Sequence, residues 1–247
     1  MKIKYGFVYA ALFISFFIFS YSAYSEQAKE TSAVSEDALF DEINEEFKDA
    51  NKVSDPFMLM NKAFFHFNDK FYYYILKPAS KGYDYVMPDV LQKGIGNFFN
   101  NISAPVRIVN SVFQGKFQKG AEEFRGFVIN SSIGLFGFLD PVKTDESKED
   151  FGQTLAVYGV DNGFYIVLPF LGASTLRDLG GRVFDFLLNP LSYMEEAEIV
   201  FGMKSLDRLN ATSLDPERYE DMMRSAIDPY ELLKDGYLQM RAKKVKE

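Results

Sequence analysis

The chain offers few side chains that could carry out chemistry. It has 247 residues, a single histidine, His66, and no cysteine. Disulfides, thiolate metal sites and thiol nucleophiles are therefore excluded, and groups that exchange protons near pH 7 are scarce. The sequence has neither a Gly-x-Ser-x-Gly elbow nor a phosphate-binding loop. We predict that the protein is not an enzyme and carries no cofactor.

Metal binding also lacks its usual ligands. His66 lies between Phe65 and Phe67 in an aromatic stretch, which favours a structural histidine over a ligand, and we predict no metal site. A calcium site made of carboxylates stays open as an alternative, although no EF-hand spacing occurs. The net charge of -8 excludes nucleic-acid binding, which requires a basic surface.

The first 25 residues have the pattern of a Sec signal peptide. Lys2 and Lys4 precede an uncharged apolar stretch, and small residues surround a cleavage site between Ser25 and Glu26. An uncleaved membrane anchor is the alternative, because the uncharged stretch is long enough to span a bilayer. We expect cleavage, and therefore export of the mature protein.

The remaining chain divides by composition. Residues 26–53 are acidic and predict a flexible linker, in which Leu39, Phe40, Ile43 and Phe47 form the apolar stripe of a short helix. Residues 54–233 predict one helical domain, and residues 234–247 a basic C-terminal tail. Cations at the end of a helix favour its dipole.

The domain is predicted to be all-α, with short irregular segments and no sheet. Asp55-Pro56, Asp140-Pro141, Asp215-Pro216 and Asp228-Pro229 each combine an N-cap residue with proline and predict helix starts. The first helix should end near Lys77, before Pro78. Further helices are predicted over 90–101, 105–114, 119–133 and 174–188, the last capped by Ser174 or Thr175 and containing an Asp178–Arg182 pair, and from Pro229 onward.

Two segments, Gly126–Leu139 and Gly163–Leu176, are uncharged over 14 residues each. As helices they are too short to span a bilayer. They are either core segments or segments that insert to the depth of one leaflet. Gly134 and Gly137 would permit a tight hairpin in the first. Non-helical backbone at that depth must lie against protein or a water-filled cavity, which hints at a lipid-facing protein with a polar interior route.

An ordered set of motifs between about Ser54 and Leu233 resembles the MlaA/VacJ family. The set comprises Asp55-Pro56 with Asn61, Lys62 and Phe65-His66-Phe67-Asn68, then Asn97-Phe98-Phe99-Asn100-Asn101, Pro105, Asn110 to Gly115, Phe127 to Gly134, Gly137 to Asp140, Phe151 to Leu155, Tyr158-Gly159-Val160, Leu168-Pro169-Phe170, Gly172, Ser174 to Asp178, Gly181 and Asp228-Pro229-Tyr230.

The resemblance implies a ring-shaped helical protein with a Gly-rich hairpin, lying in the periplasmic leaflet of the outer membrane. Such proteins remove mislocalised phospholipid from the outer leaflet through an amphipathic channel and pass it to a periplasmic lipid-carrier protein. They associate with trimeric porins and do no chemistry on the lipid.

The resemblance also suggests site residues. Phe67 and Asn68 match an element tied to channel behaviour, and Gly134 and Gly137 match glycines of a hairpin near the channel. Arg177 and Asp178 match a motif that either contacts the lipid headgroup or forms a capped, ion-paired helix end.

One feature departs from the family pattern. Its members are typically acylated on a cysteine at the end of the signal peptide, and this chain has none. We expect a protein at the periplasmic face of the outer membrane that is not lipidated on cysteine. The alternative is a soluble periplasmic protein that binds a hydrophobic ligand or links other components, and a lipid-cleaving enzyme is a remote third possibility.

Overall fold

A computed structural model describes residues 53–143 and 148–247, which belong to one compact unit of the chain. The predicted signal peptide, its cleavage site at Ser25–Glu26 and most of the linker lie outside the described residues. The elements, in chain order, are α3 (Met58–Phe71), the π-helix η1 (Tyr72–Leu76), α4 (Lys77–Val86), α5 (Asp89–Ile102), α6 (Ala104–Phe113), α7 (Phe117–Ser132), α8 (Phe151–Val157), β1 (Tyr165–Leu168), β2 (Gly172–Thr175), α9 (Leu176–Leu188), the 3-10 helix η2 (Pro190–Tyr193), α10 (Ala197–Leu214), α11 (Arg218–Arg224) and α12 (Pro229–Lys246).

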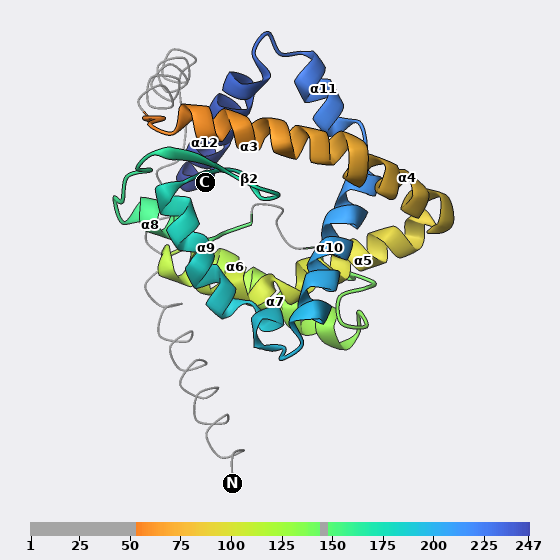
Figure 1. Ribbon diagram of the computed structural model, residues 1–247. Coiled ribbons are helices and arrows are strands. Elements are labelled where there is room, and N and C mark those ends of the chain that lie inside the picture. Colours follow the sequence, from red (N-terminus) through yellow and green to blue (C-terminus); the bar gives the residue numbers. More distant parts are fainter. Residues whose placement is uncertain (1–52, 144–147) are drawn as a thin grey trace, which may run out of the picture. The chain divides into compact units, whose positions relative to one another are not determined.

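The helices follow one another around a closed circuit (Figure 1). Helix α3 continues through η1 into α4, and α4 packs on α10, which packs on α5. Helix α5 leads to the paired helices α6 and α7, and α6 contacts α8 and α9. Helix α12 joins α8 to β2, and β1 returns to α3. The predicted all-α class is confirmed, and the order of contacts gives the ring-like arrangement.

The expected end of the first helix before Pro78 is wrong. The helix instead passes through the π-helix η1, where the Lys77 N–H donates to the Tyr72 carbonyl, five residues back. Pro78 then occupies the first turn of α4, where its missing N–H and fixed φ are tolerated. The wider π-helical turn thus lets the helix continue through Pro78, which was expected to end it.

Of the four Asp-Pro pairs, only Asp228-Pro229 caps a helix, with the Asp228 carboxylate accepting from the N–H groups of Tyr230 and Glu231. Helix α3 begins at Met58 without a side-chain cap, because Asp55 accepts hydrogen bonds from Asn61 and Tyr230 instead. Asp140 has a left-handed φ of 44° and opens no helix. Helix α11 begins at Arg218, after Asp215-Pro216.

The absence of a sheet was a wrong prediction. Strands β1 and β2 form an antiparallel hairpin in which Tyr165 faces Thr175 and Leu168 faces Gly172. Its strands supply Tyr165, Val167 and Ala173 to the core, which also includes Phe65 of α3 and Tyr230 of α12. Figure 1 shows the hairpin lying along α3 with its turn directed toward the interior of the circuit.

Small residues allow α8 and α9 to approach closely. A Cβ added to Gly181 would lie 2.4 Å from the Gly152 nitrogen, and one added to Gly152 would lie 2.5 Å from an Asp178 carboxylate oxygen. The glycines therefore permit a backbone contact that any larger residue would block. Helix α9 ends at Leu188, as expected, ahead of Pro190.

The C-terminal region continues the helical domain. The expected boundary at residue 233 falls inside α12, whose Leu238 and Arg241 are buried. Arg241 therefore does more than favour the helix dipole, because its guanidinium donates to the carboxylates of Asp150 and Asp178.

Candidate functional site

Asparagines of α3 hold the β-hairpin in place. The fully buried Asn61 donates through Nδ2 to the Tyr165 carbonyl at 3.1 Å and accepts through Oδ1 from the Val167 N–H at 2.9 Å. One side-chain amide thus satisfies the edge of β1 that β2 does not cover, as a neighbouring strand would. The motif set included Asn61, but nothing local in the sequence indicated this role.

Asn68 does the same for the hairpin turn. It lies seven residues after Asn61, about two helical turns along the same face of α3. Its Nδ2 donates to the Leu168 carbonyl at 2.9 Å and its Oδ1 accepts from the Phe170 N–H at 2.7 Å. Phe170 is held at a left-handed φ of 63°, which is rare and strained for a bulky residue. The two hydrogen bonds of the Asn68 side chain therefore hold a strained turn in place.

Phe67 joins the same structure. Its ring meets that of Phe170 edge-on at 5.1 Å, and Phe71 meets Phe170 in the same way at 5.0 Å. Phe67 and Phe170 both remain substantially exposed. The predicted residues Phe67 and Asn68 thus both contact the hairpin turn. Phe67 packs on the Phe170 ring, and Asn68 holds the backbone by hydrogen bonds.

Gly134 and Gly137 lie elsewhere on the circuit, in the turn after α7. Gly137 has a φ of 94°, and a Cβ placed there would lie 2.3 Å from the Asn101 Cβ of α5. A Cβ on Gly134 would lie 2.5 Å from the Asn130 carbonyl oxygen. Both positions require glycine, one for its conformation and contact and the other for contact alone.

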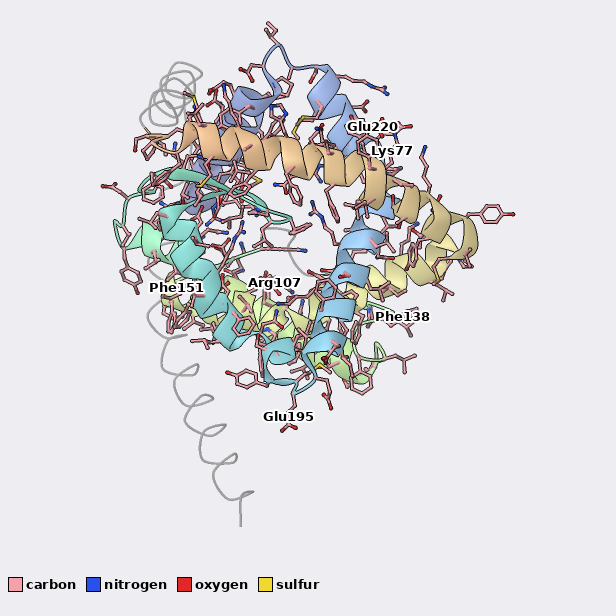
Figure 2. All side chains as sticks on the ribbon, in the orientation of Figure 1. Lys77, Arg107, Phe138, Phe151, Glu195 and Glu220 are labelled. Atoms are coloured by element: carbon pink, nitrogen blue, oxygen red, sulfur yellow. The ribbon has the colours of Figure 1, made fainter. Side chains whose placement is uncertain are left out.

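Two further asparagines build this turn, and no local pattern in the sequence indicates their partners. Asn101 donates to the Ser131 hydroxyl at 2.9 Å and to the Phe136 carbonyl at 3.2 Å. Asn130 donates to Asp140 at 2.7 Å and to the Val142 carbonyl at 2.9 Å. The ring of Phe138, labelled in Figure 2, occupies the space that a side chain at Gly94 would need. The turn is therefore rigidly held.

The same turn also carries exposed apolar side chains. Phe136 is 74% exposed and Ile133 is 73% exposed, and Leu135 and Leu139 are also exposed. Leu135 and Phe136 both have left-handed backbone conformations. A rigid turn that directs large apolar side chains into solvent marks a contact surface for a membrane or a partner.

Arg177 and Asp178 lie in a buried ionic network at the start of α9. The Asp178 carboxylate accepts from Arg177 at 3.2 Å, Arg241 at 2.9 Å and the Tyr237 hydroxyl at 2.6 Å. Thr175 caps the helix by accepting from the Asp178 N–H. The expected Asp178–Arg182 pair gives way to these contacts, and Arg182 donates to the Ala173 carbonyl. This geometry is that of a capped, ion-paired helix end.

The pKa values of Asp150 and Tyr237, which contact this network, are shifted. Burial alone would raise the pKa of Asp150, but the hydrogen bonds and charge of Arg241 outweigh burial and lower it. Burial and the Asp178 charge raise the pKa of Tyr237. These groups are thus fixed as carboxylate, guanidinium and neutral phenol across ordinary pH, which suits structure better than proton transfer.

Asp185 of α9 behaves differently. Burial is the main cause that raises its pKa to about 6, against the hydrogen bonds it accepts from Asn110 and the Phe151 N–H. A carboxyl group with such a pKa changes charge near neutral pH. The charge of the neighbouring Asp150 adds to this rise. Among residues 53–143 and 148–247, no group of three or more His, Asp or Glu side chains is placed to hold a metal ion.

Apolar and polar residues are distributed unusually over the described part of the chain. There, the buried polar and charged residues outnumber the buried apolar ones, whereas many large apolar side chains are exposed. The interior contains ion pairs such as Arg107–Glu123 at 2.9 Å, and Arg107 is labelled in Figure 2. Within the described ranges, no helix is long and apolar enough to cross a membrane.

The expected leaflet-depth segments differ from each other. Gly126–Leu139 forms the end of α7 and the exposed apolar turn. Gly163–Leu176 combines buried strand residues with an exposed turn at Phe170 and Leu171. The first segment thus presents apolar surface, and the second is partly core.

Comparison with protein families gives one match over most of the chain. Residues 53–244 match the family described as MlaA lipoprotein. A Haemophilus influenzae relative named intermembrane phospholipid transport system lipoprotein MlaA is 31% identical over 214 residues, covering 79% of this chain and 81% of the relative. The Escherichia coli K12 protein of the same name is 32% identical over 195 residues, covering 75% and 76%.

A relative of unassigned function and a solved structure extend the comparison. A Rickettsia bellii protein is 31% identical over 198 residues, covering 77% of this chain and 76% of the relative. A solved structure described as the structural basis for maintenance of bacterial outer membrane lipid asymmetry superposes with a TM-score of 0.69 at 28% identity, covering 78% of this chain and 99% of that one.

Proposed function

Because the chain belongs to the MlaA family, we propose that it is a non-enzymatic component of phospholipid transport between membranes, acting at the outer membrane. The named relatives are phospholipid transport lipoproteins, and the similar solved structure concerns outer-membrane lipid asymmetry. In this role the protein removes mislocalised phospholipid from the outer leaflet.

The observation that carries the proposal is the distribution of polarity. A water-soluble protein buries its large apolar residues and rarely buries charge. Here Glu123, Glu149, Arg107 and Asp178 are buried, while Phe136, Leu135 and Ile133 are exposed on a rigid turn. Such a protein suits lipid on its outer surface and a polar environment inside, which is what a headgroup needs while its acyl tails stay in hydrocarbon.

The site residues then have distinct roles. Asn68 holds the hairpin turn by hydrogen bonds, and this turn lies toward the interior of the circuit (Figure 1). Phe67 and Phe170 give the turn an apolar face. We assign these residues to the wall of an amphipathic route. Gly134 and Gly137 set the shape of the apolar turn at the outer surface. Arg177 and Asp178 act as a structural ion pair that holds α9.

Partners follow from the same role. A lipid that leaves the membrane through a protein needs an acceptor that shields its tails from water, and we assign that part to a periplasmic lipid-carrier protein. A trimeric porin is the proposed outer-membrane neighbour. The protein has no cysteine, so the apolar turn and the other exposed apolar side chains take the place of a thioether-linked acyl anchor.

Fractionation of cells that produce the full chain tests the membrane assignment. We expect the protein in the outer-membrane fraction and its extraction by detergent but not by high salt, because apolar burial resists salt. A fully soluble monomer that needs no detergent would favour the soluble binding or linker protein instead. Incubation with labelled phospholipid should release neither fatty acid nor lysolipid, and release of either would identify an enzyme.

A further inference from the structure

A charged groove lies between α4 and α11, away from the hairpin and the glycine turn. It has a volume of about 390 Å³ and is lined by Pro216 and by the charged residues Lys77, Lys81, Glu217, Glu220, Asp221 and Arg224. Figure 2 labels Lys77 and Glu220 side by side at this junction. The lining therefore carries equal numbers of cationic and anionic groups.

The floor of the groove is already neutralised. Glu220, which is buried, pairs through one carboxylate oxygen with Lys77 and through the other with Arg224 at 3.3 Å. Lys77 also lies over the ring of Tyr73, 5.6 Å from its centroid, which is within the roughly 6 Å expected of a cation–π contact. Both atoms of the Glu220 carboxylate are thus in use, and Lys77 is held in place.

The rim keeps charge of both signs. No hydrogen bond or ion pair within the described residues engages the side chains of Lys81, Glu217 or Asp221. The Arg224 side chain is 75% exposed, and among the described residues its one polar contact is with Glu220. Lys81 and Arg224 therefore offer positive charge, and Glu217 and Asp221 offer negative charge, to one open groove.

An irregular stretch of backbone beside the groove orients the lysines that line it. The π-helix η1 ends at Leu76, immediately before Lys77, and π-turns are enriched at functional sites. The inserted residue rotates α4 relative to α3, so that Lys77 and Lys81, one turn apart on the same face, line the groove. The Tyr72 hydroxyl donates to the Pro216 carbonyl at 2.9 Å and ties η1 to the start of the opposite wall.

We infer that this groove binds a zwitterionic phosphodiester headgroup of the phosphoethanolamine type. Lys81 and Arg224 contact the phosphate, and Glu217 and Asp221 contact the ammonium. This inference rests on the proposed transport of phospholipid, and it adds a headgroup preference and a place where the preference is exerted.

The test uses the purified full chain in detergent and soluble headgroup compounds, followed by ³¹P NMR titration. The probes are glycerophosphoethanolamine, glycerophosphoglycerol, which has the same phosphodiester charge but no ammonium, and inorganic phosphate. We expect the ethanolamine compound to bind about fivefold more tightly than the glycerol compound, the ratio expected for two weak, exposed charge pairs.

Variants separate the two halves of the site. The double variant Lys81→Gln/Arg224→Gln should weaken both diesters, whereas Glu217→Gln/Asp221→Asn should weaken only the ethanolamine compound. Lys93→Gln, at an exposed lysine of α5 outside the groove, should change neither affinity. Binding that is equal for both diesters, tightest for inorganic phosphate, or unaffected by the groove variants would overturn the inference. These titrations require no transport, and a measurement of outer-leaflet phospholipid in cells requires no binding in the groove. A failure of this inference is therefore distinguishable from a failure of the proposed function.

Discussion

At the scale of single residues, glycines of the turn after α7 should be intolerant of substitution. Gly137→Ala combines a left-handed φ with a clash against Asn101, and we expect it to lower the free energy of unfolding by roughly 2–3 kcal/mol. Gly134→Ala should also destabilise the protein, because the neighbouring Asn130 carbonyl is backbone and cannot move aside. Denaturant melts of both variants provide the measurement.

Two other glycines are matched controls. Gly115 has a φ of 76° but open space around it, and Gly82 is helical with open space. Gly115→Ala should cost only the backbone strain, about 1 kcal/mol, and Gly82→Ala should stabilise the helix by up to about 1 kcal/mol. Equal effects of Gly137→Ala and Gly115→Ala would show that the contact with Asn101 is unimportant.

A second prediction concerns Asp185, whose pKa is raised to about 6, mainly by burial. The unfolded chain releases this proton near pH 4, so the folded state binds more protons between pH 4 and pH 6. The free energy of unfolding should therefore fall as pH rises through that window, and level off above it. Asp185→Asn should remove this decline. A carboxyl signal of Asp185 that titrates near pH 4 in NMR would contradict the argument.

At the scale of elements, Asn68 should control the mobility of the hairpin turn. Asn68→Ala removes both hydrogen bonds that hold the strained Phe170 turn, and we expect about tenfold faster hydrogen exchange at the Phe170 amide. Asn68→Asp keeps the acceptor for the Phe170 N–H but loses the donor, and should give an intermediate rate. Unchanged exchange in Asn68→Ala would show that aromatic packing alone holds the turn.

Helix α12 should depend on the buried Arg241. Its guanidinium pairs with Asp150 and Asp178, so Arg241→Met leaves the Asp150 carboxylate without its cation and the Asp178 carboxylate with Arg177 alone, and should cost roughly 3 kcal/mol or more. Lys243→Met, at an exposed position of the same helix, is the control and should be nearly neutral. Because the pKa of Asp150 is lowered, the contribution of this pairing is present above the unfolded pKa of Asp150 and is lost as pH falls through the folded one.

Local sequence patterns predicted much of the helical structure, but they did not predict the contacts between residues far apart in the chain. The end of α9 before Pro190 and its cap at Thr175 depend on neighbours in sequence. The hairpin was missed because its outer edge is satisfied by Asn61, over one hundred residues away. The predicted contacts of Asp178 were incomplete for the same reason, because Arg241, which donates to Asp178, lies 63 residues further along the chain. Pro78 was expected to end the first helix, but the π-helix η1 allows the helix to continue past it.

At the scale of the whole molecule, the exposed turn after α7 should supply membrane affinity. Phe136→Asp replaces an exposed ring at a left-handed position that aspartate tolerates. We expect unchanged thermal stability but at least about tenfold weaker binding to phospholipid vesicles, the loss expected for one large apolar side chain. Glu122→Asp, on the solvated face of α7, serves as the control. Vesicle flotation that does not distinguish the two variants would place the membrane contact elsewhere.

If the protein removes phospholipid from the outer leaflet, as we propose, the amount of phospholipid in that leaflet must depend on it. Intact cells that lack the gene can be labelled with an impermeant amine reagent, and labelled phosphatidylethanolamine counted against total lipid. We expect labelling to rise on deletion and to return to normal when the intact chain is restored. Labelling that is the same with and without the protein, together with unchanged detergent sensitivity, would contradict it.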